Sequence, residues 1–297
     1  MPLVSVVIPA YNPGHYLDEA IQSVIAQTFT DWECIVVDDG STEDLSRVEK
    51  MDPRVRLIRQ LNRGLAVARN AGIAGTIGEL IALLDADDLW VPSKLATQVP
   101  GMLVDLEIGL SYTAFSFIDI GGKVIGSGWA EPRLNYLEML GKPGGPLPSA
   151  TVLRRAALQL VGGFDPFHQG HEDLDVWLKV ARFFKISFLP EKLTLYRLAE
   201  GNMSKKYEMM HDSITDVLRK HESMAHARGD AAALRAARAL RRPNRLEYGK
   251  QAYEAARRSL RGGDFRGVAL HLGRAVANNP AYFFRSIIKT RRPPLGR

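Results

Sequence analysis

This 297-residue sequence lacks features that define several large classes of protein. It has a single cysteine, Cys34, so an internal disulfide is excluded and a reducing compartment is favoured. No stretch approaches about 18 apolar residues without a charge, so no membrane span is predicted. The first residues carry no basic segment ahead of their short apolar run, so we expect no signal peptide. Together these absences favour a cytoplasmic protein.

The glycine-rich motifs that most often bind nucleotide phosphates are also missing. There is no G-x-x-x-x-G-K-[ST] motif, which excludes a P-loop hydrolase. The first expected strand is followed by "IPAYNPGHY" in place of G-x-G-x-x-G, so a dinucleotide-binding enzyme is not expected. A basic, glycine-rich loop at this point is absent too, which argues against a sugar-phosphate nucleotidyltransferase.

Apolar strands and amphipathic helices alternate over the first part of the chain. Runs rich in β-branched residues predict strands at 4–8, 34–38, 55–59 and 79–85. Apolar spacing predicts helices at 15–27 and 64–75, and Ser41 suits the start of another helix. This alternation predicts an α/β fold with a parallel sheet that is covered by helices on both faces.

Acidic residues stand at the ends of two of these strands. Asp38 and Asp39 end the second strand, and Asp85, Asp87 and Asp88 follow the fourth. Ligands of such sheets bind outside the carboxyl ends of the strands, so both clusters are expected to form one site. We interpret Asp39 as a ligand of a bound base or ribose, Asp38 as a turn residue and Asp88 as a helix cap.

Asp85-Ala86-Asp87 has the form of a D-x-D motif at this edge. Packed carboxylates repel one another, and Mn²⁺ or Mg²⁺, which prefer oxygen ligands, would neutralise them. A third acidic group, in "HQGHEDLDVWLKVA", opens a helix expected at 172–183, whose dipole favours an ionised Asp173. Asp173 is therefore a candidate general base. His168 and His171 have no further ligands at zinc spacing, so zinc is not expected.

Three segments in register resemble the family 2 glycosyltransferases, which have the GT-A fold, over about residues 3 to 200. They are "VSVVIPAYNPGHYLDEAIQSVIAQTFTDWECIVVDDGSTED", "NRGLAVARNAGIAG" and "LIALLDADDLWVP". The resemblance implies a metal-dependent, inverting transferase that uses a nucleotide-diphosphate sugar. It implies nucleotide-sugar contacts from Pro9, Tyr11, Asp39, Arg69, Asp85 and Arg197, the metal on Asp87, and Asp173 as the catalytic base.

One position departs from the family's pattern. Many relatives have a histidine two residues after "YR", and this sequence has Ala199 there. A metal or phosphate contact at this point would rely on Arg197 and Asn202. The departure leaves open an alternative in which the chain is a non-catalytic binding or scaffold protein on a degenerate GT-A fold.

The charge of the chain changes sign near residue 200. Residues 1–200 contain 18 Lys and Arg against 25 Asp and Glu, and residues 201–297 contain 21 against 8. We expect a GT-A domain at 1–200, with a nucleotide-binding half at about 1–95 and an acceptor half at about 96–200. A basic, all-α region follows at 201–297. Its basic faces fit either solvent or an anionic membrane surface, and no nucleic-acid-binding module accompanies them.

The resemblance implies an inverting glycosyltransferase of bacterial surface-polysaccharide synthesis. The donor is a nucleotide-diphosphate sugar, with UDP favoured as the carrier, and the acceptor is a hydroxyl of a glycan or a lipid-linked sugar. Transfer is expected to be a single displacement assisted by Mn²⁺ or Mg²⁺. The expected location is the cytoplasm, peripheral to the inner face of the membrane, and no nucleic-acid partner is expected.

Overall fold

The computed structural model describes residues 1–290 except 129–131, 142–144, 169 and 200–205. The chain divides into two compact units, Met1–Met139 with Gly144–Asn202 and Leu140–Pro143 with Met203–Arg297. Among the described residues, no helix combines the length and the apolar character needed to cross a membrane.

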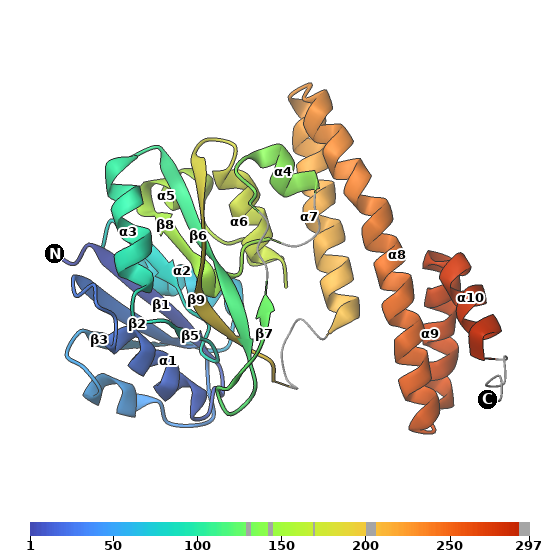
Figure 1. Ribbon diagram of the computed structural model, residues 1–297, viewed down its shortest axis with the longest axis horizontal. Helices are drawn as coiled ribbons and strands as arrows, with labels where there is room; N and C mark the ends of the chain where they lie inside the picture. The colour runs from blue at the N-terminus through green and yellow to red at the C-terminus, as the bar shows by residue number, and fades with distance from the viewer. Residues whose placement is uncertain (129–131, 142–144, 169, 200–205, 291–297) are drawn as a thin grey trace, which may run out of the picture. The chain divides into compact units, whose positions relative to one another are not determined.

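The first unit is built on a nine-stranded sheet with strand order β3-β2-β1-β4-β8-β6-β9-β5, and β7 pairs with β6 (Figure 1). The strands are β1 Val4–Ala10, β2 Trp32–Asp38, β3 Val55–Arg59, β4 Leu80–Leu83, β5 Leu89–Trp90, β6 Ile108–Ile118, β7 Val124–Gly128, β8 Thr151–Arg154 and β9 Lys185–Arg197. Strands β1 to β4 pair in parallel, as the sequence predicts. Beyond them β8 runs antiparallel to both β4 and β6, and β9 runs parallel to β6.

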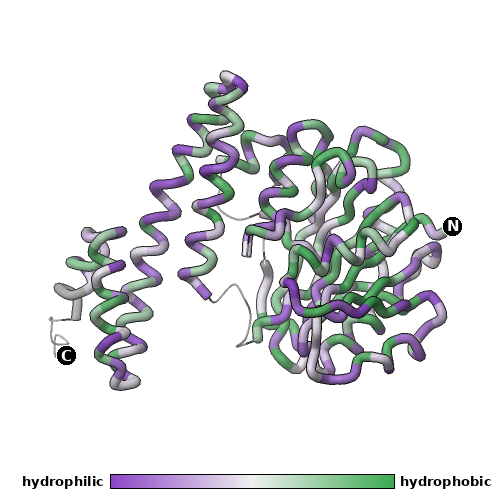
Figure 2. Tube along the Cα trace, turned by 180° about the vertical axis from the view of Figure 1, so that it is seen from behind, coloured by the Kyte–Doolittle hydropathy of each residue, from purple (hydrophilic) through white to green (hydrophobic). Residues whose placement is uncertain are grey.

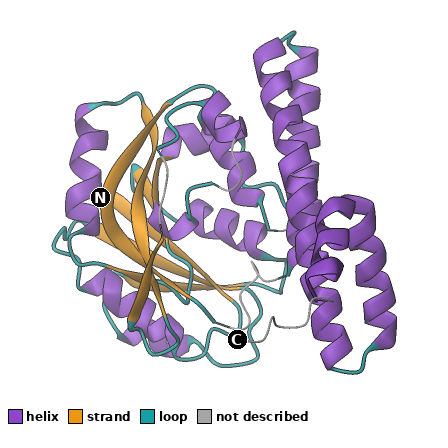
Figure 3. Cartoon of the chain, turned by 45° about the vertical axis from the view of Figure 1, so that its right-hand side comes forward, coloured by secondary structure: helices purple, strands orange, loops and turns teal. Residues whose placement is uncertain are grey.

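Helices cover both faces of this sheet (Figure 3). The helices are α1 Tyr16–Ile25, α2 Leu65–Ala74, α3 Lys94–Val104, α4 Tyr136–Gly141, α5 Arg155–Val161 and α6 Glu172–Val180, with 3₁₀ turns η1 Ser46–Lys50 and η2 Pro148–Ala150. Alternate residues of β1 and β2 face opposite sides, because successive strand side chains point to opposite faces. Those on one side pack against α1 and α3, and those on the other pack against α2.

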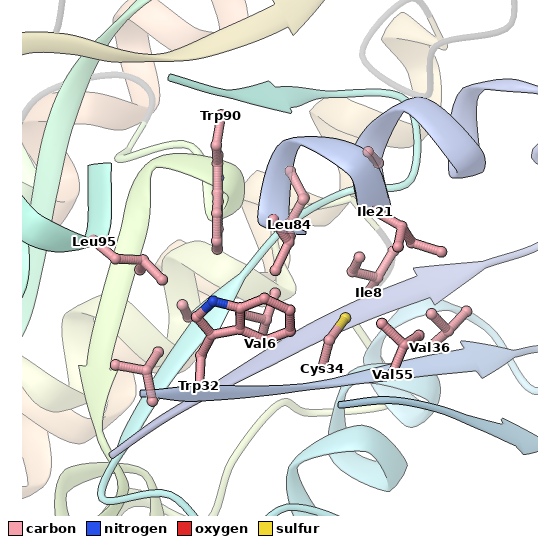
Figure 4. Close-up of a cluster of buried hydrophobic side chains, with 14 of the residues drawn as sticks. Val6, Ile8, Ile21, Trp32, Cys34, Val36, Val55, Leu84, Trp90 and Leu95 are labelled. Atoms are coloured by element: carbon pink, nitrogen blue, oxygen red, sulfur yellow. The ribbon is translucent and has the colours of Figure 1, made fainter. Parts of the chain in front are cut away.

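The larger of these two cores surrounds Cys34 in the middle of β2. Figure 4 shows Val6 and Ile8 of β1 beside Ile21 of α1 and Leu95 of α3. All of them are fully buried. On the opposite face α2 lies so close to the sheet that a Cβ at Gly72 would fall 2.4 Å from Val7 Cγ1. The sheet is therefore fixed from both sides, which holds the ends of its strands in place.

The helix expected to start at Ser41 does not form. Only the short turn η1 follows β2, beginning at Ser46. The amides that would start a helix bind elsewhere: the Ser41 N–H donates to Asp38 Oδ1 at 2.8 Å and the Thr42 N–H donates to Asn12 Oδ1 at 2.8 Å. This segment instead ties the loop after β2 to the loop after β1.

The second unit is helical, with α7 Tyr207–Ala227, α8 Ala231–Arg261, α9 Phe265–Asn278 and α10 Pro280–Thr290. Asp230 and Asp264 cap α8 and α9 by accepting main-chain N–H groups. Ala252, Tyr253 and Ala275 form a small buried cluster between α8 and α9. The tube in Figure 2 shows hydrophilic residues recurring along α8.

Candidate active site

The carboxyl ends of β2 and β4 lie on either side of the end of β1. In the strand register Asp38 lies opposite Ala10, and Leu83 lies opposite Val7. The Asp39 N–H donates to the carbonyl of Ala10 at 2.8 Å, which continues the pairing of β2 beyond its last residue. The loops that follow the three strands therefore meet at one edge of the sheet, and the predicted site residues of both acidic clusters lie on them.

Asp39 is a buried acid with three partners in its own chain. Its Oδ1 accepts from Gln60 Nε2 at 2.7 Å and from the Arg63 N–H at 2.9 Å, and its Oδ2 accepts from the Gly64 N–H at 2.9 Å. Gly64 has a φ of 89°, a conformation that favours glycine, immediately before α2. Asp39 thus shapes the entry to α2, a role the sequence did not indicate. Because a carboxylate can accept about four hydrogen bonds, it retains room for one more.

The loop after β1 is held by polar contacts that leave Tyr11 at the surface. Pro9 is buried within β1, whereas 56% of Tyr11 is exposed. The next residue, Asn12, has a positive φ of 46°, and its N–H donates to Ser41 Oγ at 3.0 Å. Tyr11 is therefore placed at the sheet edge on an anchored loop.

Arg69 joins the D-x-D segment to the start of α6. Its guanidinium is fully buried and pairs with Asp85 Oδ1 at 2.8 Å and with Glu172 Oε1 at 2.6 Å. The second carboxylate oxygen of Glu172 accepts the Gly170 N–H at 2.8 Å. Burial disfavours the charged form of Arg69, but the neighbouring carboxylates outweigh it and raise the pKa of Arg69. Arg69 is thus a buried cation between two acids that stand far apart in sequence.

Asp87 and Asp88, two neighbouring acids, have different surroundings. Burial and the adjacent charge of Asp85 raise the pKa of Asp87 to about 6. Asp88 is fully buried and accepts from Ser149 Oγ at 2.6 Å and from the Arg197 N–H at 3.0 Å. The expectation that Asp88 caps a helix is therefore wrong. The next helix, α3, begins at Lys94, too far along the chain for Asp88 to cap it, while Asp88 connects three segments of the core.

Arg197 is committed to protein groups at the end of β9. Its Nε donates to the carbonyl of Asp87 at 2.8 Å, and one terminal nitrogen pairs with Glu19 Oε2 at 2.6 Å. The guanidinium also lies 4.5 Å from the centre of the Tyr16 ring, and the residue is fully buried. In this structure Arg197 positions the main chain of the D-x-D loop. Asn202, named with it in the sequence, lies outside the described residues.

Asp173 lies in the first turn of α6, beside Glu172. Burial, and secondly the charge of Glu172, raise the pKa of Asp173 to about 7, although the positive charge of Arg69 lowers it. The helix dipole alone predicts an ionised group with a low pKa. Burial outweighs the dipole here, so Asp173 is poised between its two protonation states near neutral pH.

The histidines near α6 do not form a clear metal site. Asp165, His168 and Asp175 offer ligand atoms within 4.8 Å of one another. However, Lys179 Nζ lies 3.0 Å from Asp175 Oδ2, so a lysine already neutralises that carboxylate. Burial lowers the pKa of His171 to about 4, which keeps it neutral. We assign no metal to this cluster.

Several residues of the site were not singled out from the sequence. Ser149 binds both Asp88 and the Asp85 N–H, and Glu19 pairs with Arg197. Neither stands in a motif. Glu172 adjoins the predicted base, and its acidic pair with Asp173 was the one available signal. The remaining contacts depend on segments that are distant in sequence.

Comparisons with known proteins point to one family. Residues 5–147 match the description "Glycosyl transferase family 2". The Escherichia coli protein named UDP-Glc:alpha-D-GlcNAc-diphosphoundecaprenol beta-1,3-glucosyltransferase WfgD is 31% identical over 210 residues, covering 68% of this chain and 79% of that protein. An uncharacterized glycosyltransferase of Rickettsia felis is 33% identical over 208 residues, covering 67% of this chain and 33% of that protein. This chain thus spans about a third of the length of the Rickettsia relatives that it matches.

A solved structure supports the fold over nearly the whole chain. The mannosyltransferase PcManGT from Pyrobaculum calidifontis, in complex with GDP-Man and Mn²⁺, matches with a TM-score of 0.63 and 19% identity. The match covers 97% of this chain and 86% of that one. Identity this low supports the fold and nothing finer. With the sequence relatives, it shows that the chain belongs to glycosyltransferase family 2 and has the GT-A fold.

Proposed function

We propose that this chain is an inverting glycosyltransferase that uses a nucleotide-diphosphate sugar, with UDP as the favoured carrier. The acceptor is a hydroxyl of a glycan or a lipid-linked sugar in bacterial surface-polysaccharide synthesis. The name of the E. coli relative, which includes both UDP-Glc and a diphosphoundecaprenol acceptor, supports this choice. The observation that carries it is the pair of acids at one edge of the sheet. Asp87 is half-buried and has a raised pKa, and the pKa of Asp173 is about 7.

The donor would extend along the edge of the sheet. Strands β2 and β4 flank β1, so their ends lie two strand spacings, about 10 Å, apart. We place the nucleoside at the loop after β1 and β2, with Tyr11 against the base, Pro9 lining the pocket and Asp39 using its remaining acceptor position. The diphosphate would then lie toward Asp85 and Asp87. This separation suits a ligand with a base at one end and phosphates at the other.

The carboxylates at the D-x-D segment fit a hard divalent cation. Asp85 is neutralised by Arg69, whereas Asp87 forms no salt bridge within the part of the chain that the structure describes. Burial and the charge of Asp85 raise the pKa of Asp87, so an added cation would favour its ionised form. Asp87 would hold Mn²⁺ or Mg²⁺ together with donor phosphates and water. When bound, the ion supplies positive charge for the leaving diphosphate.

Asp173 would act as the general base. A carboxylate with a pKa of about 7 is half ionised at neutral pH and accepts a proton more readily than an ordinary aspartate. It would take the proton of the acceptor hydroxyl as that oxygen forms its bond to the anomeric carbon. The bond to the nucleotide breaks on the opposite face, and the electron pair leaves with the diphosphate. One displacement inverts the configuration.

Arg69 and Arg197 would contribute to this reaction chiefly by holding other site residues in place. Arg69 fixes Asp85 and Glu172, and through Glu172 it fixes the first turn of α6, which carries Asp173. Arg197 fixes the main chain at Asp87. Arg69 could in addition donate its Nε–H, which has no partner among the described residues, to a phosphate. We place the enzyme in the cytoplasm, at the inner membrane face, where a lipid-linked acceptor would be presented.

The first test is thermal unfolding with UDP, GDP, CDP and dTDP, each with and without Mn²⁺. A nucleotide at 100 times its Kd should stabilise the protein by about 2.7 kcal/mol. We expect one nucleotide to do so only with metal, and Asp87→Ala to remove the effect. Asp105→Ala, which removes an exposed acid of the same unit, should keep it. If no nucleotide shifts the wild type, the scaffold alternative replaces the proposal.

A further inference from the structure

The helical unit contains a basic cavity that takes no part in the proposed sugar transfer. It lies between α7 and α8, with Asn278 of α9 at its margin, and its volume is ≈ 620 Å³. Five arginines line it. They are Arg219 of α7 and Arg238, Arg241, Arg242 and Arg245 of α8. The four from α8 recur at the spacing that puts side chains on one face of a helix, so the sequence itself concentrates charge there.

This positive charge is only partly neutralised within the protein. Glu222 pairs with Arg238 at 2.9 Å and with Arg241 at 3.2 Å, and Asp216 pairs with Arg219 at 3.2 Å. Within the described parts of the chain, the guanidinium groups of the other two arginines, Arg242 and Arg245, form no ion pair. Five arginines against two carboxylates leave an excess of three positive charges. Because like charges four residues apart on a helix repel, an anion in the cavity would relieve the strain on α8.

The base of the cavity is polar and fixed. The His211 ring stacks on Tyr248 with centroids 3.9 Å apart, and His211 Nδ1 lies 3.2 Å from Asn244 Nδ2. The Thr215 hydroxyl donates to the carbonyl of His211 at 2.7 Å. Tyr248 is buried, so the ring stack is anchored in the helix pair. A rigid polar base under a rim of arginines suits an anionic group with several oxygen atoms.

We propose that this cavity binds the phosphate group of an anionic membrane lipid. Guanidinium groups pair with phosphate oxygens through two parallel hydrogen bonds, and several arginines can share one phosphate. The cavity's ≈ 620 Å³ exceeds the needs of a bare phosphate and is of the size that holds a headgroup. The proposal deepens the proposed membrane location, on which the choice of a lipid over a free phosphate compound rests.

Exposed apolar side chains of the same unit favour a membrane lipid over a soluble phosphate compound as the ligand. Phe265 and Leu270 of α9 and Phe284 of α10 are 74%, 53% and 57% exposed. Arg266 and Arg285 directly follow these two phenylalanines, and helices that carry aromatic and basic residues together are typical of proteins that lie at a membrane interface. A soluble phosphate compound would need only the arginines. The combination of a basic cavity large enough for a headgroup and exposed phenylalanines therefore points to a membrane lipid.

The test is binding of the full chain to phosphatidylcholine vesicles with and without phosphatidic acid, measured by flotation. Arg242→Gln/Arg245→Gln should lower partitioning onto phosphatidic acid vesicles by about tenfold or more. The control, Arg235→Gln/Lys250→Gln, removes the same charge from exposed positions of the same helix, outside the cavity and away from Phe265. It should lower partitioning by less than about threefold. Melting curves of both variants should match the wild type.

Three results would overturn the proposal. Equal losses in both variants would mean that diffuse charge, and no particular cavity, attracts the vesicles. Equal binding to vesicles with and without phosphatidic acid would show that the anionic headgroup is not recognised, because phosphatidylcholine has a phosphate group but no net charge. Stabilisation by inorganic phosphate without vesicle binding would assign the cavity to a soluble ligand. Because the assay contains neither donor nor metal, its outcome is separate from that of the nucleotide test.

Discussion

Arg69→Met tests whether one buried arginine joins the two halves of the proposed active site. In the wild type its guanidinium lies between Asp85 and Glu172, at 2.8 and 2.6 Å. The Glu172 side chain is only 4% exposed, whereas that of Asp85 is 28% exposed. Removing the cation therefore leaves one fully buried carboxylate without its partner and a second that water can partly solvate.

The expected cost follows from this difference in burial. Removing one partner of a buried ion pair lowers the free energy of unfolding by about 3–5 kcal/mol. Most of this loss should come from the unpaired charge of Glu172. For a unit of about 200 residues this corresponds to a fall in Tm of roughly 6–20 °C. The same change removes the positive charge that lowers the pKa of Asp173, so this pKa should rise above about 7. Any residual turnover should then require a higher pH.

The assay is urea unfolding followed by tryptophan fluorescence. All four tryptophans lie before residue 202, so the signal reports the first unit. Arg59→Met removes an arginine from an exposed ion pair, 3.7 Å from Asp44, and should cost less than about 1 kcal/mol. Arg69→Met/Glu172→Gln should recover part of the loss, because the unpaired buried charge is gone. The reasoning fails if Arg69→Met costs no more than Arg59→Met, or if the two changes at the buried pair are additive.

Three further changes test other parts of the structure. Burial lowers the pKa of Lys94 from 10.5 to about 7, so between these values the unfolded chain binds a proton that the folded chain does not. The free energy of unfolding should therefore rise with pH across this window, and Lys94→Met should flatten the rise in urea titrations. Gly72→Ala should cost about 1–3 kcal/mol in the same assay, since its Cβ would lie 2.4 Å from Val7 Cγ1; an unchanged midpoint would contradict the packing. Asp173→Asn should abolish sugar transfer yet keep the metal-dependent nucleotide shift, and wild-type kcat/KM should fall about tenfold per pH unit below the pKa of about 7. If kcat/KM does not fall as the pH is lowered below about 7, Asp173 is not the general base.

The first half of the fold could be predicted because local and global signals agree there. The β-branched run at 55–59 forms β3 over the same residues, and the helix expected at 64–75 forms as Leu65–Ala74. Parallel strands buried on both faces consist of continuous apolar runs, which are easy to recognise. Chain order then places their carboxyl ends at one edge, so the position of the acidic clusters follows without any side-chain contact.

The second half of the sheet was harder because its signals are short or non-local. Strands β5 and β8 have two and four residues, too few to show a period. The long strand β9 begins at Lys185, although only its last part, "KLTLYR" at 192–197, has a sequence pattern that predicts a strand. Its extension is fixed by pairing with β6, which lies more than sixty residues away along the chain. Tertiary pairing decides such segments, and one sequence does not display it.

Apolar spacing in the last part of the chain predicts a seam between two helices, formed by Tyr253, Ala256, Leu260, Phe265, Ala269, Leu272 and Val276. Only part of this seam is buried. Tyr253 and Ala256 are buried, but Leu260 and Phe265 are 58% and 74% exposed. Both exposed residues flank the turn at 262–264, at the tip of the α8–α9 pair. Apolar spacing predicts which side chains share a face, but it does not show how far along two helices that face stays covered.

A tight turn explains why Asp85, Asp87 and Asp88 have different partners. The Asp88 N–H donates to the carbonyl of Asp85 at 3.1 Å, so these two residues form the ends of a four-residue turn. Its ends adjoin the sheet, where Arg69 neutralises Asp85 and where Ser149 and the main chain bind Asp88. Asp87 occupies a central position, and no salt bridge reaches it within the described residues. The spacing of the D-x-D motif thus pairs one acid with the scaffold and leaves the other without a salt bridge, which supports the proposal that Asp87 holds the metal.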